Sequence, residues 1–172
     1  SLQQLEDMVG ESNINALVLH LNPAMEVVQP GGDSDFSGCL DVIARLVAEV
    51  SVPIIVKETG CGLSRDVGRR LVDAGVRTVD VSGAGGTSWV GVETLRAKAT
   101  RSLGEAFWDW GIPTAGSVAQ LSGLGLQIIA TGGVRHGVDI ARAIALGATA
   151  GGLARPFLQA HNRGGQEAVI AL

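Results

Sequence analysis

Short apolar runs alternate along the chain with segments of helical periodicity. The runs are rich in Ile, Val and Leu and predict strands that are apolar on both faces; they span residues 16–20, 53–57, 78–82 and 127–131, with a weaker fifth at 148–154. Apolar residues spaced three or four apart predict helices between them, at residues 2–9, 40–50, 64–74, 117–124 and 138–146, and from 156 onward. Ser64 and Gly75 suit the start and the end of the third helix.

This order of elements predicts parallel strands joined by right-handed helical crossovers. An open doubly wound sheet and a closed barrel both fit it. The barrel is favoured because a chemically capable residue follows each strand, at the edge where TIM barrels build their active sites; these residues are His20, Lys57, Ser82, Gly132 and Ala154. We therefore expect an α/β fold, a TIM (β/α)8 barrel, of which this chain carries about the last five βα units.

Five strands cannot close an eight-stranded barrel, and an open arc leaves two sheet edges exposed. Residues 1–172 are therefore expected to be the C-terminal portion of a single barrel, whose N-terminal βα units are absent from this chain. The chain is 46% apolar and 17% charged, with a mean hydropathy of +0.30. So little charge indicates extensive burial, either within that barrel or against partners such as further copies of the chain.

Composition narrows the classes of function. The net charge is −4 without a basic stripe, which argues against nucleic acid as a partner. The sequence has no run of about 18 apolar residues of the kind that spans a membrane. Two cysteines, Cys39 and Cys61, make neither a disulfide framework nor a metal cluster. They are interpreted as reduced thiols packed as small hydrophobes, as in a cytoplasmic protein.

The strongest candidate site is a phosphate site near the C-terminal end. Thr131, Gly132, Gly133, Val134 and Arg135 join a strand to a helix, and a second strand-to-helix junction follows at Ala154-Arg155. Backbone N–H groups at such junctions bind anions with the help of the helix dipole. In TIM barrels the loops after the last two strands commonly form this site.

Three further clusters contain residues that could bind a ligand, but their patterns are less specific. His20, Asn22 and Glu26 follow the first strand in an expected loop, where they could bind polar ligands or a divalent cation, or simply shape a turn. Lys57 ends the second strand and could either meet an anionic ligand or pair with Glu58. A Gly-rich stretch, residues 82–89, opens a long insertion from 83 to 113, and Gly-rich loops alone are a weak signal. The three tryptophans are expected mainly in core packing or subunit contacts, with lining of a site as the alternative.

Taken together, these stretches resemble the type 2 isopentenyl diphosphate isomerase family. The resemblance covers nearly all of residues 16–156, in family order, through the segments HLNPAMEVVQPGGD, IIVKETGCGLSRD, VDVSGAGGTSW, GEAFWDWGIPTAGS, IIATGGVRHGVDIARAIALGA and LARP. The combination is specific to that family, although the Gly-Gly-Val-Arg and Ala-Arg-Pro pieces are shared with other FMN barrels.

The resemblance implies an FMN enzyme that interconverts isopentenyl and dimethylallyl diphosphate in the cytoplasm as a homo-oligomer, a tetramer or larger. In this family the reduced flavin acts as acid and base without net redox change, and NADPH keeps it reduced. The implied FMN contacts are Lys57, Ser82, Thr87, Gly132, Gly133, Val134, Arg135, Ala154 and Arg155. His20, Asn22 and Met25 match substrate positions, and Glu26 matches the Mg²⁺ ligand.

One position departs from the family pattern. The family has Gln immediately before the metal-binding Glu, and this chain has Met25, whose thioether cannot donate a hydrogen bond. Either Gln29 or a water replaces the missing amide, or the protein is an altered paralogue that binds FMN and a prenyl diphosphate, with or without turnover. The family's N-terminal Arg-Lys pair has no counterpart here.

A different FMN enzyme is the main alternative. FMN-dependent 2-hydroxy-acid oxidases share the barrel and the phosphate loops. They resemble one another in a His-Gly-Gly-Arg motif before the last phosphate loop, where this chain has Trp110-Gly-Ile-Pro-Thr-Ala. That difference counts against the oxidase.

Overall fold

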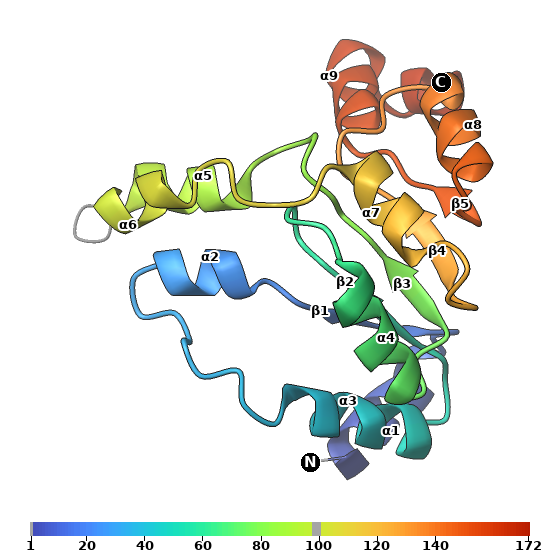
Figure 1. Cartoon of the computed structure of the whole chain (residues 1–172). Coiled ribbons are helices and arrows are strands. Elements are labelled where there is room, and N and C mark those ends of the chain that lie inside the picture. The colour runs from blue at the N-terminus through green and yellow to red at the C-terminus, as the bar shows by residue number, and fades with distance from the viewer. Residues whose placement is uncertain (1, 98–100) are drawn as a thin grey trace.

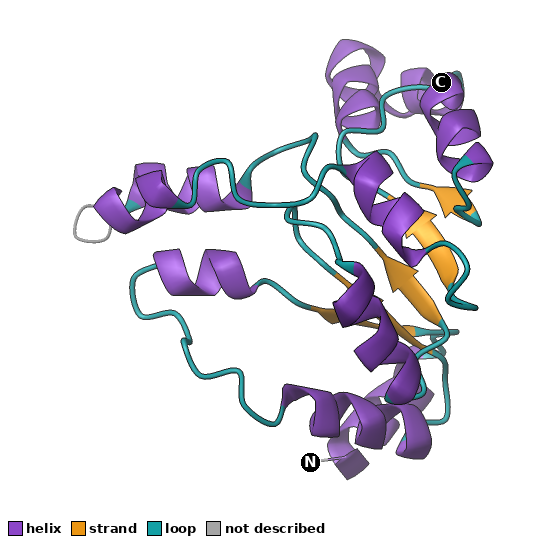
Figure 2. Cartoon of the chain, viewed as in Figure 1, coloured by secondary structure: helices purple, strands orange, loops and turns teal. Residues whose placement is uncertain are grey.

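Five parallel strands in sequence order form the centre of the computed structural model, which describes residues 2–97 and 101–172. The strands are β1 (Leu17–His20), β2 (Ile54–Lys57), β3 (Thr78–Asp80), β4 (Gln127–Ala130) and β5 (Ala150–Gly151). Each strand pairs only with its sequence neighbours, so the described sheet has no reversal of strand order. Figure 2 shows the strands fanning across the molecule with their carboxyl ends toward one edge.

Nine helices are described, and most connect consecutive strands. They are α1 (Leu2–Ser12), α2 (Pro23–Val28), α3 (Cys39–Glu49), α4 (Arg65–Asp73), α5 (Trp89–Arg96), α6 (Arg101–Ala106), α7 (Thr114–Leu121), α8 (Gly137–Ala145) and α9 (Arg155–Ile170), the last kinked at Gly164 and Gly165. In Figure 1, α2, α5 and α6 form an arm beside the carboxyl edge of the sheet, apart from the other helices.

The core lies on one face of the sheet. Strand residues such as Ile54, Val56 and Val79 are buried there, in one cluster with residues of five helices, α1, α3, α4, α7 and α8. The residues that alternate with them face the other way, and Val18 on that face is 50% exposed. A doubly wound sheet carries helices on both faces, whereas strands in sequence order with helices on one face form an arc of a barrel. The expected barrel arc is therefore confirmed.

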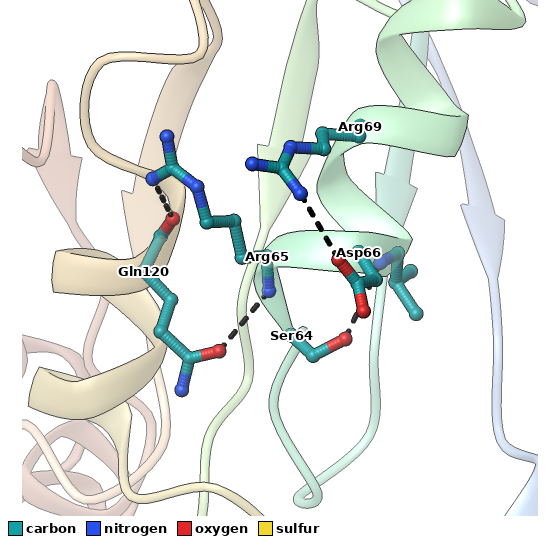
Figure 3. A network of polar contacts seen from close by, with 6 residues as sticks. Ser64, Arg65, Asp66, Arg69 and Gln120 are labelled. Atoms are coloured by element: carbon teal, nitrogen blue, oxygen red, sulfur yellow. Dashed lines mark hydrogen bonds and ion pairs between the residues drawn. The ribbon is translucent and has the colours of Figure 1, made fainter.

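Polar contacts at the amino end of α4 bind it to α7 (Figure 3). The backbone N–H of Arg65 donates to Oε1 of Gln120 at 3.1 Å, and its guanidinium donates to the Gln120 carbonyl at 3.0 Å. Ser64 caps α4 by accepting the Val67 N–H at 3.3 Å, as its sequence position predicted. These contacts fix two neighbouring helices of the outer layer, and through them the strand ends that they follow.

The first difference from the sequence expectation is a helix where a loop was expected. Residues 20–30 contain α2, which starts at Pro23. Pro is well suited to the first turn because its fixed φ matches the helix and its missing N–H would be unpaired there. Asn22 occupies the N-cap position without capping, since its side chain donates instead to Glu26. Pro and Asn were interpreted as turn residues, although both are also common at helix starts.

The remaining differences concern lengths. The insertion after β3, for which no element was predicted, holds α5 and α6, and residues 98–100 between them lie outside the described residues. β3 ends at Asp80 instead of residue 82, because Ser82 has a φ of +35° and leaves the extended conformation. β5 covers two residues of the expected seven. Within the described residues, no helix is both long and apolar enough to cross a membrane.

Candidate active site

A cavity of about 590 Å³ lies at the carboxyl ends of β3, β4 and β5. Its size falls within the usual range of small-molecule sites. We call it the first cavity. It is lined by Gly60, Ser82, Gly83, Gly85, Gly86, Thr87, Trp89, Thr131, Gly132, Gly133, Val134, Arg135, Gly152, Leu153, Ala154 and Arg155. The structure thus brings together eight of the nine residues that the resemblance linked to FMN, with Lys57 as the exception.

Glycine is required where the loop after β4 crosses the loop after β3. Gly132 and Gly133 have φ values of +98° and +81°, in the region that side chains rarely adopt. A Cβ on Gly132 would lie 2.1 Å from the Gly83 carbonyl oxygen, and one on Gly133 would lie 2.2 Å from the Gly85 carbonyl oxygen. The cavity floor is therefore backbone packed directly on backbone.

Thr114, the first residue of α7, holds this crossing in place. Its hydroxyl lies 2.6 Å from the Gly132 carbonyl oxygen and 3.1 Å from that of Thr131, and donates to them. Its backbone N–H donates to the Ala84 carbonyl at 3.2 Å. One residue therefore joins the loops after β3 and β4, although neither loop contains it.

The first cavity has the donors that an anion needs. In the described part of the chain, the backbone N–H groups of Gly133, Val134 and Ala154 have no hydrogen-bond partner. Ala154 is also the N-cap residue of α9 and makes no side-chain cap, so the positive end of that helix dipole points at the cavity. The side chains of Arg135 and Arg155 are exposed beside it. This donor set fits a phosphate group.

A second, wider cavity of about 1260 Å³ opens on the other side of the loop after β2. His20, Asn22 and Glu26 line it, together with Leu21, Phe107, Trp110 and Ile112 among its apolar residues. The polar groups of residues 20–26 therefore share this cavity with apolar side chains from residues 107–112. Met25 lines neither cavity and is half-buried on α2.

The carboxylate of Glu26, on the wall of this second cavity, accepts three hydrogen bonds. It accepts from the Asp33 backbone N–H at 3.1 Å, from Asn22 Nδ2 at 2.8 Å and from Gln29 Nε2 at 2.6 Å. These bonds, led by the Asp33 N–H, hold the pKa of Glu26 below its usual value. The carboxylate stays ionised, as a ligand for a hard cation must. Among the described residues, no group of three or more His, Cys, Asp or Glu forms a metal site, so any cation here needs oxygens from a ligand or water.

His20 is held by the loop after β2. Its Nε2 lies 2.9 Å from the Thr59 hydroxyl, which is 3.3 Å from the Leu21 carbonyl. Burial, and then the positive charge of Lys57, lower the pKa of His20. The imidazole is therefore biased toward its neutral form, in which one ring nitrogen donates and the other accepts a hydrogen bond.

Lys57 lies between His20 and Asp80 in one row across the open face of the sheet. Its ammonium donates to the backbone carbonyl of Glu58 at 2.6 Å, rather than to the Glu58 carboxylate as the alternative reading supposed. Asp80 in turn accepts from the Thr131 hydroxyl at 2.5 Å and from the Ser82 N–H at 3.1 Å. Lys57 lines neither cavity but stands in the strand row that runs between them.

Two features were missed or misjudged in the sequence. Thr114 gave no signal, because nothing in a Pro-Thr pair indicates contact with residues 17 and 18 positions further along. The tryptophans are at the surface of the described structure rather than in its core, with Trp110 61% exposed. Trp89 lines the first cavity and Trp110 the second. Both tryptophans lie close to glycines in the sequence, and this proximity was the available indication that they line a cavity.

Comparison with known proteins agrees with a flavin site. A family model described as FMN-dependent dehydrogenase matches residues 3–172. The chain is 47% identical over 176 residues to a protein of Methanosarcina mazei, 54% over 162 residues to one of Synechococcus sp. and 49% over 174 residues to one of Thermococcus kodakarensis. Each of these relatives is named isopentenyl-diphosphate delta-isomerase.

The matches cover nearly all of this chain but only part of each relative. They include 99%, 92% and 99% of the chain, and 48%, 46% and 46% of the three relatives in the same order. The chain therefore spans just under half the length of these relatives.

Proposed function

Because the chain belongs to the FMN-dependent dehydrogenase family, we propose that the complete protein interconverts isopentenyl diphosphate and dimethylallyl diphosphate as an FMN-dependent, type 2 isomerase. Relatives 47–54% identical to this chain carry the name of that activity. The observation that carries the proposal is the convergence of Gly133 and Ala154 on one anion-binding cavity, with polar groups for a second ligand across the loop after β2.

The first cavity is proposed to hold FMN. The N–H groups of Gly133, Val134 and Ala154 would bind its phosphate, with Arg135 and Arg155 adding charge. Gly132 allows the close backbone crossing beneath that phosphate. Ser82, Thr87 and Lys57 would contact the ring system, Lys57 from its place in the strand row. Reduced FMN would supply the acid and base groups of an allylic rearrangement, with NADPH as the reductant that maintains it.

The second cavity is proposed to hold the prenyl diphosphate and Mg²⁺. Glu26 would bind the cation, and the substrate diphosphate and waters would complete its coordination. Asn22 and a neutral His20 would bind diphosphate oxygens. Glu26→Ala is expected to raise the Mg²⁺ concentration needed for activity, and an unchanged requirement would remove Glu26 from this role.

The apolar residues of the second cavity have a separate task. Adding a proton to the substrate double bond creates carbocation-like character that water would trap. Leu21, Phe107 and Ile112 would face the alkyl group and exclude water from it. Charge compensation at the diphosphate and a dry environment at the reacting carbons would then act at opposite ends of the same ligand.

Exposed apolar side chains support a proposal on assembly. Leu95 on α5 and Ile170 on α9 are 68% and 75% exposed. Burial of such side chains against further copies of the protein, in a homo-oligomer within the cytoplasm, would remove them from water. Size-exclusion chromatography with light scattering of the complete protein tests this directly.

The activity is tested with the complete flavoprotein, reduced under anaerobic conditions and supplied with Mg²⁺ and isopentenyl diphosphate. Formation of dimethylallyl diphosphate without net oxidation of the flavin supports the isomerase. The family description favours one other function, an FMN-dependent oxidoreductase. Stoichiometric reduction of the oxidised flavoprotein by a 2-hydroxy acid, with no isomerisation by the reduced form, would replace the proposal with that function. Bound flavin with neither reaction would indicate a paralogue.

A further inference from the structure

The loop after β2, Glu58–Gly62, separates the two cavities. Gly60 lines the first cavity, whereas Glu58, Cys61 and Gly62 line the second. Its backbone turns sharply, with φ values of +97° at Gly60 and +71° at Gly62. Any change in the shape of this loop would therefore alter both cavities at once.

The loop is wrapped around a carboxylate from its own first residue. Oε2 of Glu58 accepts from the backbone N–H groups of Thr59 and Cys61, both at 2.5 Å, and of Gly62 at 3.2 Å. Glu58 is only 5% exposed. Burying a carboxylate is costly unless hydrogen bonds compensate it, and here burial outweighs those bonds enough to raise the pKa of Glu58. None of the proposed contacts to FMN or to the substrate uses this costly buried group.

From this loop, contacts reach a group of each cavity. Toward the second cavity, the Thr59 hydroxyl meets Nε2 of His20 at 2.9 Å. Toward the first cavity, the Gly60 N–H donates to the Ser82 carbonyl at 2.7 Å and lies 3.2 Å from the Ser82 hydroxyl oxygen. Ser82 needs such support because its φ of +35° is unusual for a residue with a side chain.

We propose that Glu58 is a positioning residue, whose carboxylate shapes the Thr59–Gly62 loop so that His20 and Ser82 are held in fixed relation across the two cavities. The inference rests on the proposed function, because it takes the first cavity as the cofactor site and the second as the substrate site. Glu58 lines the second cavity, but the bonds of its Oε2 all go to backbone N–H groups of its own loop. It acts through Thr59 on one side and Gly60 on the other.

Glu58→Gln tests the role of the charge, because the amide keeps the size of the side chain but is a weaker acceptor. In the complete flavoprotein we expect a loss of about 10- to 100-fold in kcat/KM, as removal of an orienting partner causes at other sites. The His20 imidazole signals in NMR should shift, and the pKa of His20 should rise toward its ordinary value as the loop loosens. The Kd for FMN should increase as well. Glu49→Gln, the same change on the exposed face of α3, is the matched control and should leave all four quantities unchanged.

Thr59→Val separates the contact of the loop with His20 from its contact with Ser82. It removes the hydroxyl next to His20 but keeps the backbone N–H that Glu58 accepts, so the His20 signals should shift while the Kd for FMN stays the same. Thr59→Ser should restore the His20 signals. A folded Glu58→Gln protein with unchanged His20 signals and unchanged FMN affinity would overturn the proposal. If Glu58→Gln does not fold, unchanged His20 signals in Thr59→Val would overturn it.

The NMR and flavin measurements do not need turnover. If wild-type protein fails to isomerise isopentenyl diphosphate, the proposed function falls, while shifts in His20 and FMN affinity on Glu58→Gln would still support the coupling. The reverse pattern, isomerisation with no effect of Glu58→Gln on His20 or on FMN, would remove the coupling alone.

Discussion

The Cα of Gly133 packs so closely on Gly85 that a Cβ at position 133 would lie 2.2 Å from the Gly85 carbonyl oxygen. No side chain can occupy that space, and the oxygen belongs to backbone that cannot move without distorting the loop after β3. The two loops therefore form one rigid floor for the first cavity. We propose that this floor directs the free N–H groups of Gly133 and Val134 toward the phosphate of FMN.

Gly133→Ala is expected to destroy this arrangement. The left-handed conformation alone costs an alanine about 1–2 kcal/mol, and the clash adds to it. The Kd for FMN, measured by flavin fluorescence, should rise at least about tenfold, which corresponds to a loss of about 1.4 kcal/mol. Gly137→Ala is the matched control, because a Cβ on Gly137 meets nothing within 4 Å and its φ is not positive. Equal FMN affinity in both variants would contradict the rigid floor.

Thr114→Val should weaken FMN binding without touching the cofactor. The substitution keeps the shape of the side chain but removes the donor to the carbonyls of Thr131 and Gly132. Leaving partly buried acceptors unsatisfied costs about 1–3 kcal/mol, which should appear in the unfolding free energy measured with urea. Thr114→Ser keeps the hydroxyl and should recover FMN affinity. If Thr114→Ser and Thr114→Val bind FMN with the same affinity, the hydroxyl does not hold the two loops together.

The first cavity could be anticipated from the sequence because it is built from two local strand-to-helix junctions. A strand followed by Gly-Gly and a helix places N–H groups at a helix start, and two such junctions in adjacent βα units must lie side by side in a parallel sheet. The prediction that Gly133 and Ala154 face one cavity is confirmed. Thr114 could not be found in this way, because its contact with the β4 loop depends on where α7 packs.

The second cavity shows a different limit. Asn22 and Glu26 were recognised as candidate ligands, but the loop predicted around them was wrong, since Asn and Pro occur both in turns and at helix starts. The choice was made by tertiary packing, with α2 against α5 and α6. The hydrogen bonds of the Glu58 carboxylate also could not be predicted from the sequence. Its three donors are backbone N–H groups, which almost every residue type has.

Met25→Gln is expected to increase the isomerisation rate if Met25 limits it. Glutamine restores the amide of the family pattern on α2, immediately before Glu26. An increase of about 10-fold or more in kcat would be consistent with recovered general acid–base assistance. The measurement is anaerobic turnover of both proteins at saturating Mg²⁺. Because Met25 lines neither cavity in the present structure, an unchanged or lower rate would indicate that Gln29 or a water already performs the task.

Glu26 should contribute to stability in a pH-dependent way. Its pKa is lower in the folded protein than the ordinary value of 4.5, because of hydrogen bonds from the Asp33 N–H, Asn22 and Gln29. The unfolded chain therefore takes up a proton first, so the stabilisation is complete above that value and is lost as the pH falls through the folded pKa. Glu26→Gln removes this titration. The difference in unfolding free energy between wild type and variant should stay constant from about pH 8 to pH 6 and shrink below about pH 4.5. A difference that already changes near neutral pH would assign the effect to another group.

The most direct test of the central claim compares FMN with riboflavin, which has the same ring system but lacks the phosphate. If the backbone N–H groups of Gly133, Val134 and Ala154 bind that phosphate, FMN should bind to the complete protein at least about 100-fold more tightly than riboflavin, since charge-assisted bonds of about 1.5–3 kcal/mol each are lost. Arg155→Gln, which removes one positive charge beside the cavity, should reduce the ratio of the riboflavin Kd to the FMN Kd. Equal affinity for FMN and riboflavin would contradict the assignment of the first cavity as a phosphate site.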